Sequence, residues 1–160
     1  MWTMLTSACD GWAALYQDSA ALRTGVGFAH IAGLVVGGGC AIAEDRAILI
    51  ADDAAVEVRR AQVRRAHHAA HRVVIGGLGV VMISGVLLFA ADLQTYLHSR
   101  PFWIKMGLVG MLLVNGWFMT RAETTFASVA TAWPRLRLAA VLSIALWLAT
   151  TLAGAALPNV

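Results

Sequence analysis

The stretch from Val73 to Ala91, which reads VVIGGLGVVMISGVLLFAA, decides the class of fold. It contains no charged residue, and at about 1.5 Å of helix rise per residue it can cross the roughly 30 Å hydrocarbon core of a bilayer. Transmembrane β-strands need shorter segments of alternating polarity, and open backbone is not tolerated in lipid. The stretch therefore predicts a transmembrane helix.

Three further apolar runs have a similar length. Together they predict four transmembrane helices at about residues 24–43, 73–97, 102–121 and 135–157, within one membrane domain that covers residues 1–160. The composition agrees, because 59% of the residues are hydrophobic and only 13% are charged, whereas a soluble domain carries about 25% charged residues. The predicted fold class is an all-α, integral membrane four-helix bundle surrounded by lipid.

The distribution of basic residues predicts the orientation. Nine of the 12 Lys and Arg residues lie in the first and third connections, and the other three are Arg23, Arg100 and Lys105. Because cytoplasmic loops are enriched in Lys and Arg, both long connections are expected in the cytoplasm and both termini outside. These arginines suit a position beside anionic lipid, so the basic balance requires no nucleic-acid partner.

Two helical segments are expected outside the membrane core. The first 21 residues contain no Lys or Arg and are expected to form a short interfacial helix. Its apolar side chains would be Trp2, Leu5, Trp12, Leu15 and Tyr16. The second helix is expected to begin near Asp53 and to extend into the cytoplasm by roughly 18 residues, about 27 Å, because acidic residues precede a basic run without Gly or Pro.

The first membrane helix carries a ridge of small residues. Every fourth position holds one, namely Gly25, Ala29, Gly33, Gly37 and Ala41. Such a ridge lets another helix approach closely, so Gly25, Gly33 and Gly37 could pack within the chain, against a second copy or against a partner membrane protein. His30 lies on the same face. An ionisable residue at this depth is either a satisfied packing residue or a ligand.

Three polar residues are expected at one level of the outer leaflet. Asp92 ends the second apolar run, Lys105 lies about one turn inside the third, and His30 has a similar depth in the first. A lone charge there is costly, so we expect Asp92 and Lys105 to pair across the hairpin, either as a clamp or as the frame of a pocket. Asn115 is expected to hydrogen-bond Ser84 or Ser143 on a neighbouring helix.

The remaining histidines offer two weaker candidate sites. His67 and His71 share one helical face at a spacing at which two imidazoles can bind Zn or Cu. No carboxylate or cysteine lies within one turn of them, so an interfacial cluster beside lipid headgroups is the simpler interpretation. His98 is the only other histidine on the side of His30, which makes it the one candidate partner for a bis-histidine haem.

Several short motifs resemble those of known membrane families. The residues Ser84–Phe89, Asp92, Phe102–Lys105 and Asn115-Gly116 resemble a pattern in bacterial four-helix membrane proteins that are similar to the CopD copper-resistance membrane domain. The resemblance implies a bundle in the bacterial inner membrane. Related bundles include bis-histidine b-type cytochromes, which implies haem b or copper as a cofactor.

The first helix is similar to that of the same families. His30–Gly33, running to Asp45-Arg46, matches their histidine-to-acid helix, although a leucine that separates the acid from the arginine there is missing. If the pattern is functional, it assigns the site to His30, Lys105 and Asn115, together with Asp92.

The sequence contains no nucleophile–base pair, phosphate loop or carboxylate dyad, so hydrolysis and group transfer are not expected. The leading hypothesis is an outer-leaflet pocket that binds haem b, copper or a quinone-like small molecule, for electron transfer or copper handling. His30 would be the ligand or proton carrier, framed by Asp92 and Lys105 and oriented by Asn115. The alternative is a non-catalytic accessory subunit of a larger membrane complex.

Overall fold

The computed structural model describes residues 2–51 and 55–157, with the side chains at positions 2–8, 66, 68 and 69 left aside. The described residues form helices and no strand. In chain order the elements are α1 (Trp2–Asp18), α2 (Ala20–Gly33), the π-helical turn η1 (Leu34–Gly38), α3 (Gly39–Ile50), α4 (Val56–Ala91), α5 (Leu93–His98), α6 (Arg100–Ser128), the 3-10 turn η3 (Ala130–Ala132) and α7 (Trp133–Ala156).

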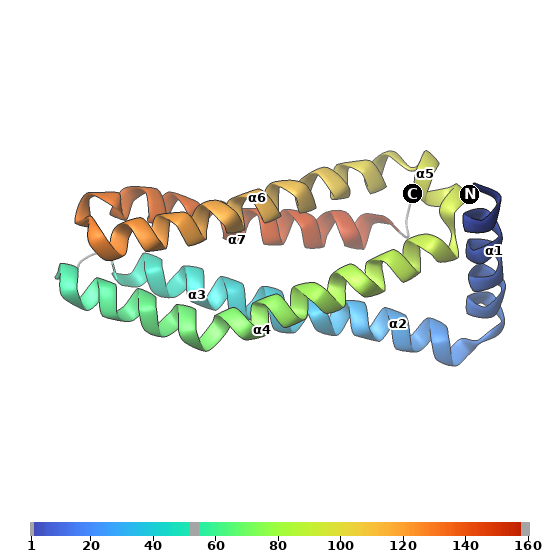
Figure 1. Cartoon of the computed structure of the whole chain (residues 1–160), viewed down its shortest axis with the longest axis horizontal. Helices are drawn as coiled ribbons and strands as arrows, with labels where there is room; N and C mark the ends of the chain where they lie inside the picture. The colour runs from blue at the N-terminus through green and yellow to red at the C-terminus, as the bar shows by residue number, and fades with distance from the viewer. Residues whose placement is uncertain (1, 52–54, 158–160) are drawn as a thin grey trace.

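Four stretches of the described chain are long and apolar enough to cross a membrane: Ala20–Ile50, Ala70–Ala91, Arg100–Ser128 and Ala130–Ala156. They confirm the expected all-α membrane bundle. The four rods lie side by side, and the two ends of the chain are found at the same end of the bundle (Figure 1). An even number of crossings produces this arrangement.

Three of the four helices end elsewhere than expected, and one of them is α6, which runs on to Ser128 instead of ending near residue 121. The first long helix runs on through α3 to Ile50, and the second ends at Ala91 instead of residue 97. The backbone leaves the helical region at Asp92, where φ is −150° and ψ is 65°. The Asp92 carboxylate accepts a hydrogen bond from the Thr95 backbone N–H at 3.3 Å, and this cap begins α5 as a separate helix.

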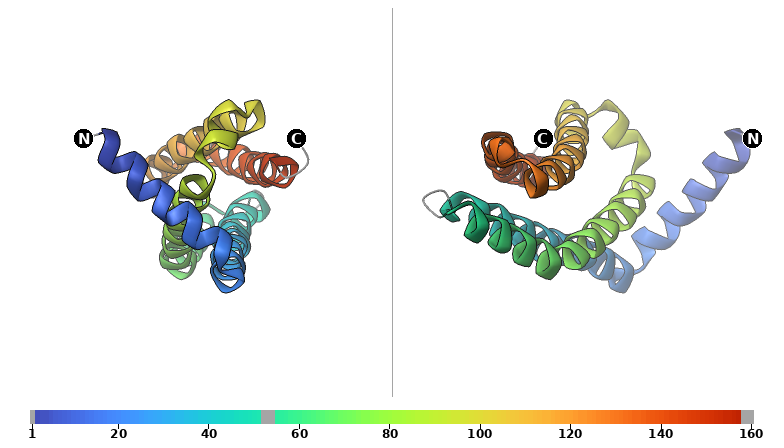
Figure 2. Two further views of the ribbon diagram at one scale, coloured as in Figure 1. Left: turned by 90° about the vertical axis from the view of Figure 1, so that its right-hand side faces the viewer. Right: turned by 60° about the vertical axis from the view of Figure 1, so that its left-hand side comes forward.

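Both helical segments outside the membrane core are present. Helix α4 has 36 residues and begins at Val56, ahead of its apolar part, although the expected start near Asp53 lies outside the described residues. Helix α1 crosses the end of the bundle (Figures 1 and 2). The Trp12 indole N–H donates to the Leu87 carbonyl at 2.9 Å and so attaches α1 to α4. The expected contributions of Trp2 and Leu5 fall outside the described side chains.

Glycines bring the first and second membrane helices into close contact. A Cβ atom on Gly77 would lie 2.6 Å from the Gly37 Cα atom, and one on Gly33 would lie 3.0 Å from the Gly77 carbonyl oxygen. Only glycine fits such an approach of two backbones. Gly33 and Gly37 are therefore used within the chain and are not free for a partner, whereas Gly25 faces open space.

The bundle consists of two helix pairs. Helix α4 packs on α2 and α3, and α6 packs on α7 along most of its length, whereas α3 meets α7. A core of buried apolar side chains joins the pairs at the end remote from the termini: Ile48, Ala51, Val63, Phe126, Ala132, Trp133, Leu136 and Ala140. Between α4 and α6 the pairs separate, and two cavities lie there.

Candidate functional site

Both cavities lie between α4 and α6, one behind the other along the bundle. The first, of about 330 Å³, is called the His30 cavity and lies toward the termini. The second, of about 300 Å³, is called the His67 cavity and lies toward the other end. They share three lining residues, Leu78, Leu112 and Trp147, which form the boundary between them.

The His30 cavity is apolar except at three positions. His30 from α2, Lys105 from α6 and Thr150 from α7 line it, and the remaining lining residues are glycine or aliphatic, methionine and aromatic side chains. The structure therefore brings together His30 and Lys105, as the sequence predicted, and adds Thr150. Asp92 and Asn115 do not line this cavity.

Hydrogen bonding fixes the tautomer of neutral His30. The ring Nδ1 lies 3.0 Å from the Ser84 Oγ, and the Ser84 hydroxyl donates to the Val80 carbonyl at 2.6 Å. Because Ser84 has only one proton, its oxygen accepts from the Nδ1–H of His30. In the neutral ring the lone pair is then on Nε2, which makes His30 a hydrogen-bond acceptor toward a bound molecule.

The other two polar groups supply donors. The Lys105 amine lies against α7, 3.5 Å from the place that a Cβ on Gly154 would take, and no ion pair joins Lys105 to a carboxylate among the described residues. Thr150 is 4% exposed, and its hydroxyl has no hydrogen-bond partner. A buried polar group normally has a partner, so the Thr150 hydroxyl indicates a site for a polar group of a ligand, and the half-buried Lys105 amine lies in the same cavity.

The expected Asp92–Lys105 ion pair does not form. Helix α4 ends at Ala91, and the Asp92 carboxylate that follows it caps α5 instead of pairing with Lys105. Burial, together with the nearby Asp92 carboxylate, raises the pKa of Tyr96. Asn115 makes an interhelical bond, but its Nδ2 donates to the Ala139 carbonyl of α7 at 3.0 Å and not to Ser84 or Ser143.

Among the described residues, the second histidine that a bis-histidine haem requires does not line the His30 cavity. His98 is exposed at the end of α5, its Nδ1 lies 2.9 Å from the Gln94 carbonyl, and it does not line the cavity. A bis-histidine haem needs two imidazoles that face each other across one space. Among the described residues, the cluster of His, Cys, Asp and Glu ligands that the structure forms is elsewhere, at Glu44, His67 and Glu123.

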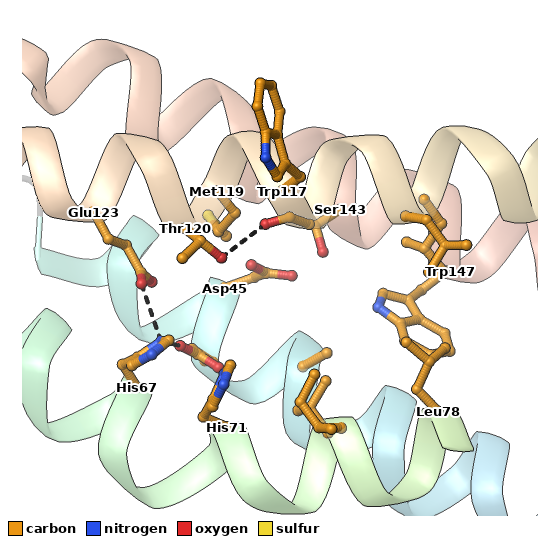
Figure 3. Close-up of a pocket in the computed structure, with 17 residues that line it drawn as sticks. Asp45, His67, His71, Leu78, Trp117, Met119, Thr120, Glu123, Ser143 and Trp147 are labelled. Atoms are coloured by element: carbon orange, nitrogen blue, oxygen red, sulfur yellow. Dashed lines mark hydrogen bonds and ion pairs between the residues drawn. The ribbon is translucent and has the colours of Figure 1, made fainter. Parts of the chain in front are cut away.

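The His67 cavity contains the acidic residues that the local sequence around His67 lacks. Glu44 arrives from α3 and Glu123 from α6, and Asp45 and His71 line the same space (Figure 3). The two glutamates were not among the predicted ligands because they lie on other helices and not within one turn of the histidines. In the structure Glu44, Asp45 and Glu123 lie within membrane-spanning stretches, where acids are rare and functional, but the spans predicted from the sequence end just before them, at residues 43 and 121.

Comparison with protein-family models, with curated proteins and with solved structures finds no match for this chain. The resemblance to CopD-like bundles therefore stays a prediction. Each of the two cavities has a separate set of polar groups.

Proposed function

We propose that this multi-pass membrane protein binds an amphipathic small molecule of the quinol class in the His30 cavity. One observation carries the proposal: an otherwise apolar cavity combines an imidazole acceptor with a buried hydroxyl that has no partner and a lysine amine that forms no ion pair with the described carboxylates. The size of about 330 Å³ is within the range of about 300–1,000 Å³ that small-molecule sites occupy.

The polar groups select the class of ligand. The Nε2 of neutral His30 accepts a hydrogen bond from a ligand hydroxyl, and Lys105 and Thr150 donate to a second ligand oxygen. A quinol has both groups on one ring. An acyl chain has neither a hydroxyl nor a second oxygen. A carboxylate would accept from Lys105 and Thr150 but has no proton to donate to His30.

Aromatic side chains suit a ring-shaped body. Phe89 and Phe102 stack with centroids 5.2 Å apart, and both line the cavity with Trp103. Aromatic rings pack well in offset or edge-on contact with such surfaces. The proposed role is therefore binding of the quinol form within the membrane, with His30 as the acceptor of the hydrogen bond that a quinol hydroxyl donates.

Fluorescence titration of the detergent-purified protein with a short-tailed 1,4-benzoquinol tests the proposal. Trp103 and Trp147 line the cavity, so binding should quench tryptophan emission saturably. Thr150→Val and His30→Leu should each weaken binding by about tenfold, because each removes one hydrogen bond of about 1–1.5 kcal/mol. Thr151→Val is the matched control, since that hydroxyl donates to the Trp147 carbonyl of its own helix and is outside the cavity.

Three outcomes would contradict the proposal. Unchanged affinity in both the His30→Leu and Thr150→Val variants would place the quinol elsewhere. A Soret band that His30→Leu removes would show that the residue binds haem instead. If the benzoquinol does not quench emission at any soluble concentration, the accessory-subunit alternative becomes the better account.

A further inference from the structure

Three side chains from three helices converge in the His67 cavity. The Nδ1 of His67, on α4, lies 3.1 Å from the Glu44 Oε1 and 3.0 Å from the Glu123 Oε2. The ligand atoms that these residues offer all lie within 4.8 Å of one another. Glu44 belongs to α3 and Glu123 to α6, so the arrangement exists only in the folded bundle.

Hydrogen bonding alone explains this arrangement poorly. The Nδ1 atom of an imidazole carries at most one proton, so it cannot give a separate hydrogen bond to each of two carboxylates. Around a tetrahedral cation with bonds of about 2.0–2.1 Å, in contrast, neighbouring ligand atoms lie about 3.3 Å apart. We propose that Glu44, His67 and Glu123 bind a divalent first-row transition cation of the Zn²⁺ type.

A second observation points to the same space. The Glu123 Oε1 and the Asp45 Oδ2 are buried without a hydrogen-bond partner. Asp45 is only 2% exposed, lines the same cavity and extends into it beside Ser143 (Figure 3). A buried carboxylate oxygen without a partner is unusual. Asp45 is not one of the three close ligands, so at this position it can accept a hydrogen bond from a water on the cation.

The charge of the cavity favours a divalent ion. Glu44, Asp45 and Glu123 bring three carboxylates between membrane helices, and no ion pair within the described part of the chain joins them to Lys or Arg. A protonated His67 would offset one negative charge, whereas a divalent cation offsets two and leaves His67 neutral.

The chemistry of the ligands narrows the class of cation. Imidazole nitrogen with carboxylate oxygen suits Zn²⁺, Fe²⁺ and Mn²⁺, whereas Cu⁺ prefers sulfur. The ring of His71 packs against that of His67 at a centroid distance of 4.5 Å and supports its orientation. Figure 3 shows both rings on the same side of the cavity, facing Glu123 and Asp45 across it.

The test uses the full-length protein in detergent after treatment with a chelator, with ZnCl₂ as the probe. Calorimetric titration, followed by metal analysis after desalting, should find one bound equivalent per chain. Glu44→Gln and Glu123→Gln should each weaken Zn²⁺ binding by at least about 100-fold, since even the outer partners of metal ligands contribute about 10–100-fold. Glu57→Gln is the matched control, because this exposed glutamate of α4 pairs with Arg60 away from the cavity and should bind as the wild type does.

A stability measurement keeps the test decisive where a variant folds poorly. Zn²⁺ should raise the unfolding midpoint of the wild type and of Glu57→Gln, because a ligand that binds only the folded state stabilises it. The midpoint of Glu123→Gln should not move. Wild-type protein that binds no Zn²⁺, Mn²⁺ or Fe²⁺, or glutamine variants that bind as the wild type does, would overturn the proposal and leave His67 as a charged bridge between two glutamates. Neither result would affect quinol binding, which involves other residues.

Discussion

At the scale of single residues, Gly77 is where the backbones of the first two membrane helices approach each other most closely among the described glycines. Its Cα hydrogen is the only group that fits against Gly37, and the contact sets the distance between the first two membrane helices. The same contact fixes the rotation of α4, because helices that touch at glycines cannot turn about their axes without a clash. The directions in which His67 and Ser84 face follow from that rotation.

We predict that Gly77→Ala destabilises the protein by about 1–3 kcal/mol, because the added methyl group overpacks a site without space. Gly79→Ala is the matched control, since a Cβ there meets nothing within 4 Å and the higher helix propensity of alanine should leave stability equal or raised. Thermal unfolding in the same detergent compares the two. Equal midpoints would show that the Gly37–Gly77 contact yields without cost.

Asn115 is the buried polar link between α6 and α7. Its side chain is 7% exposed and donates to the Ala139 carbonyl. Asn115→Ala should lower stability by about 0.6–2 kcal/mol, the usual contribution of an interhelical hydrogen bond in a membrane. Thr120→Ala should have a smaller effect, because the Thr120 hydroxyl bonds to Gly116 of its own helix. A loss in Thr120→Ala as large as that in Asn115→Ala would contradict this assignment.

At the scale of elements, one long-range hydrogen bond attaches α1 to α4. The Trp12 indole donates to Leu87, and the rings of Trp12 and Tyr16 lie 5.9 Å apart. We predict that Trp12→Phe increases hydrogen exchange throughout α1 and leaves the four membrane spans unchanged. Tyr16→Phe keeps the ring and should exchange as the wild type does. Equal protection of α1 in all three proteins would mean that the indole bond does not attach this helix.

The π-helical turn η1 is the irregular part of the first membrane helix. It includes Gly37, which meets α4, and Gly38, where a Cβ would lie 3.0 Å from the Trp147 ring of α7. Single π turns insert an extra residue into a helix and are frequent at functional sites. Here the turn presents glycine to two neighbouring helices, and Trp147 forms part of the boundary between the cavities.

At the scale of the whole molecule, the structure places both termini at one end of the bundle (Figure 1), and the distribution of basic residues is the basis for proposing which side of the membrane that end faces. The first and third connections hold nine of the 12 Lys and Arg residues, so the end with the termini is proposed to face outward. With that orientation, the His30 cavity opens within the outer leaflet and the His67 cavity within the inner leaflet. A quinol site and a cation site would then lie on opposite sides of the bilayer.

We predict that a reporter active only outside the cytoplasm works when fused to the C-terminus. We also predict that Cys9, which is partly exposed on α1, reacts with a membrane-impermeant maleimide added to intact cells. Cys9→Ser is the control, because any remaining label would come from Cys40. A reporter active only in the cytoplasm, with labelling only after lysis, would reverse the assignment of both cavities.

The amino-acid sequence by itself determined the properties that depend on polarity along the chain. Apolar length predicted the four membrane helices, and the absence of basic residues from the first 21 positions favoured a separate helix there. The four-residue spacing of glycines predicted close packing of the first helix, which Gly33 and Gly37 confirm. These features follow from lipid and from helix geometry, whichever helix lies beside which.

Only the tertiary structure decided which polar groups meet. Asp92 was expected beside Lys105 but caps α5 instead, because the chain leaves the helix at that residue. Glu44 and Glu123 reach His67 from two other helices, and local sequence around the histidine contains no sign of them. The physical reason is that contacts between helices depend on the rotation and axial offset of each helix. The packing at Gly37–Gly77 and between α6 and α7 determines both, and the spacing of residues along the chain does not encode them.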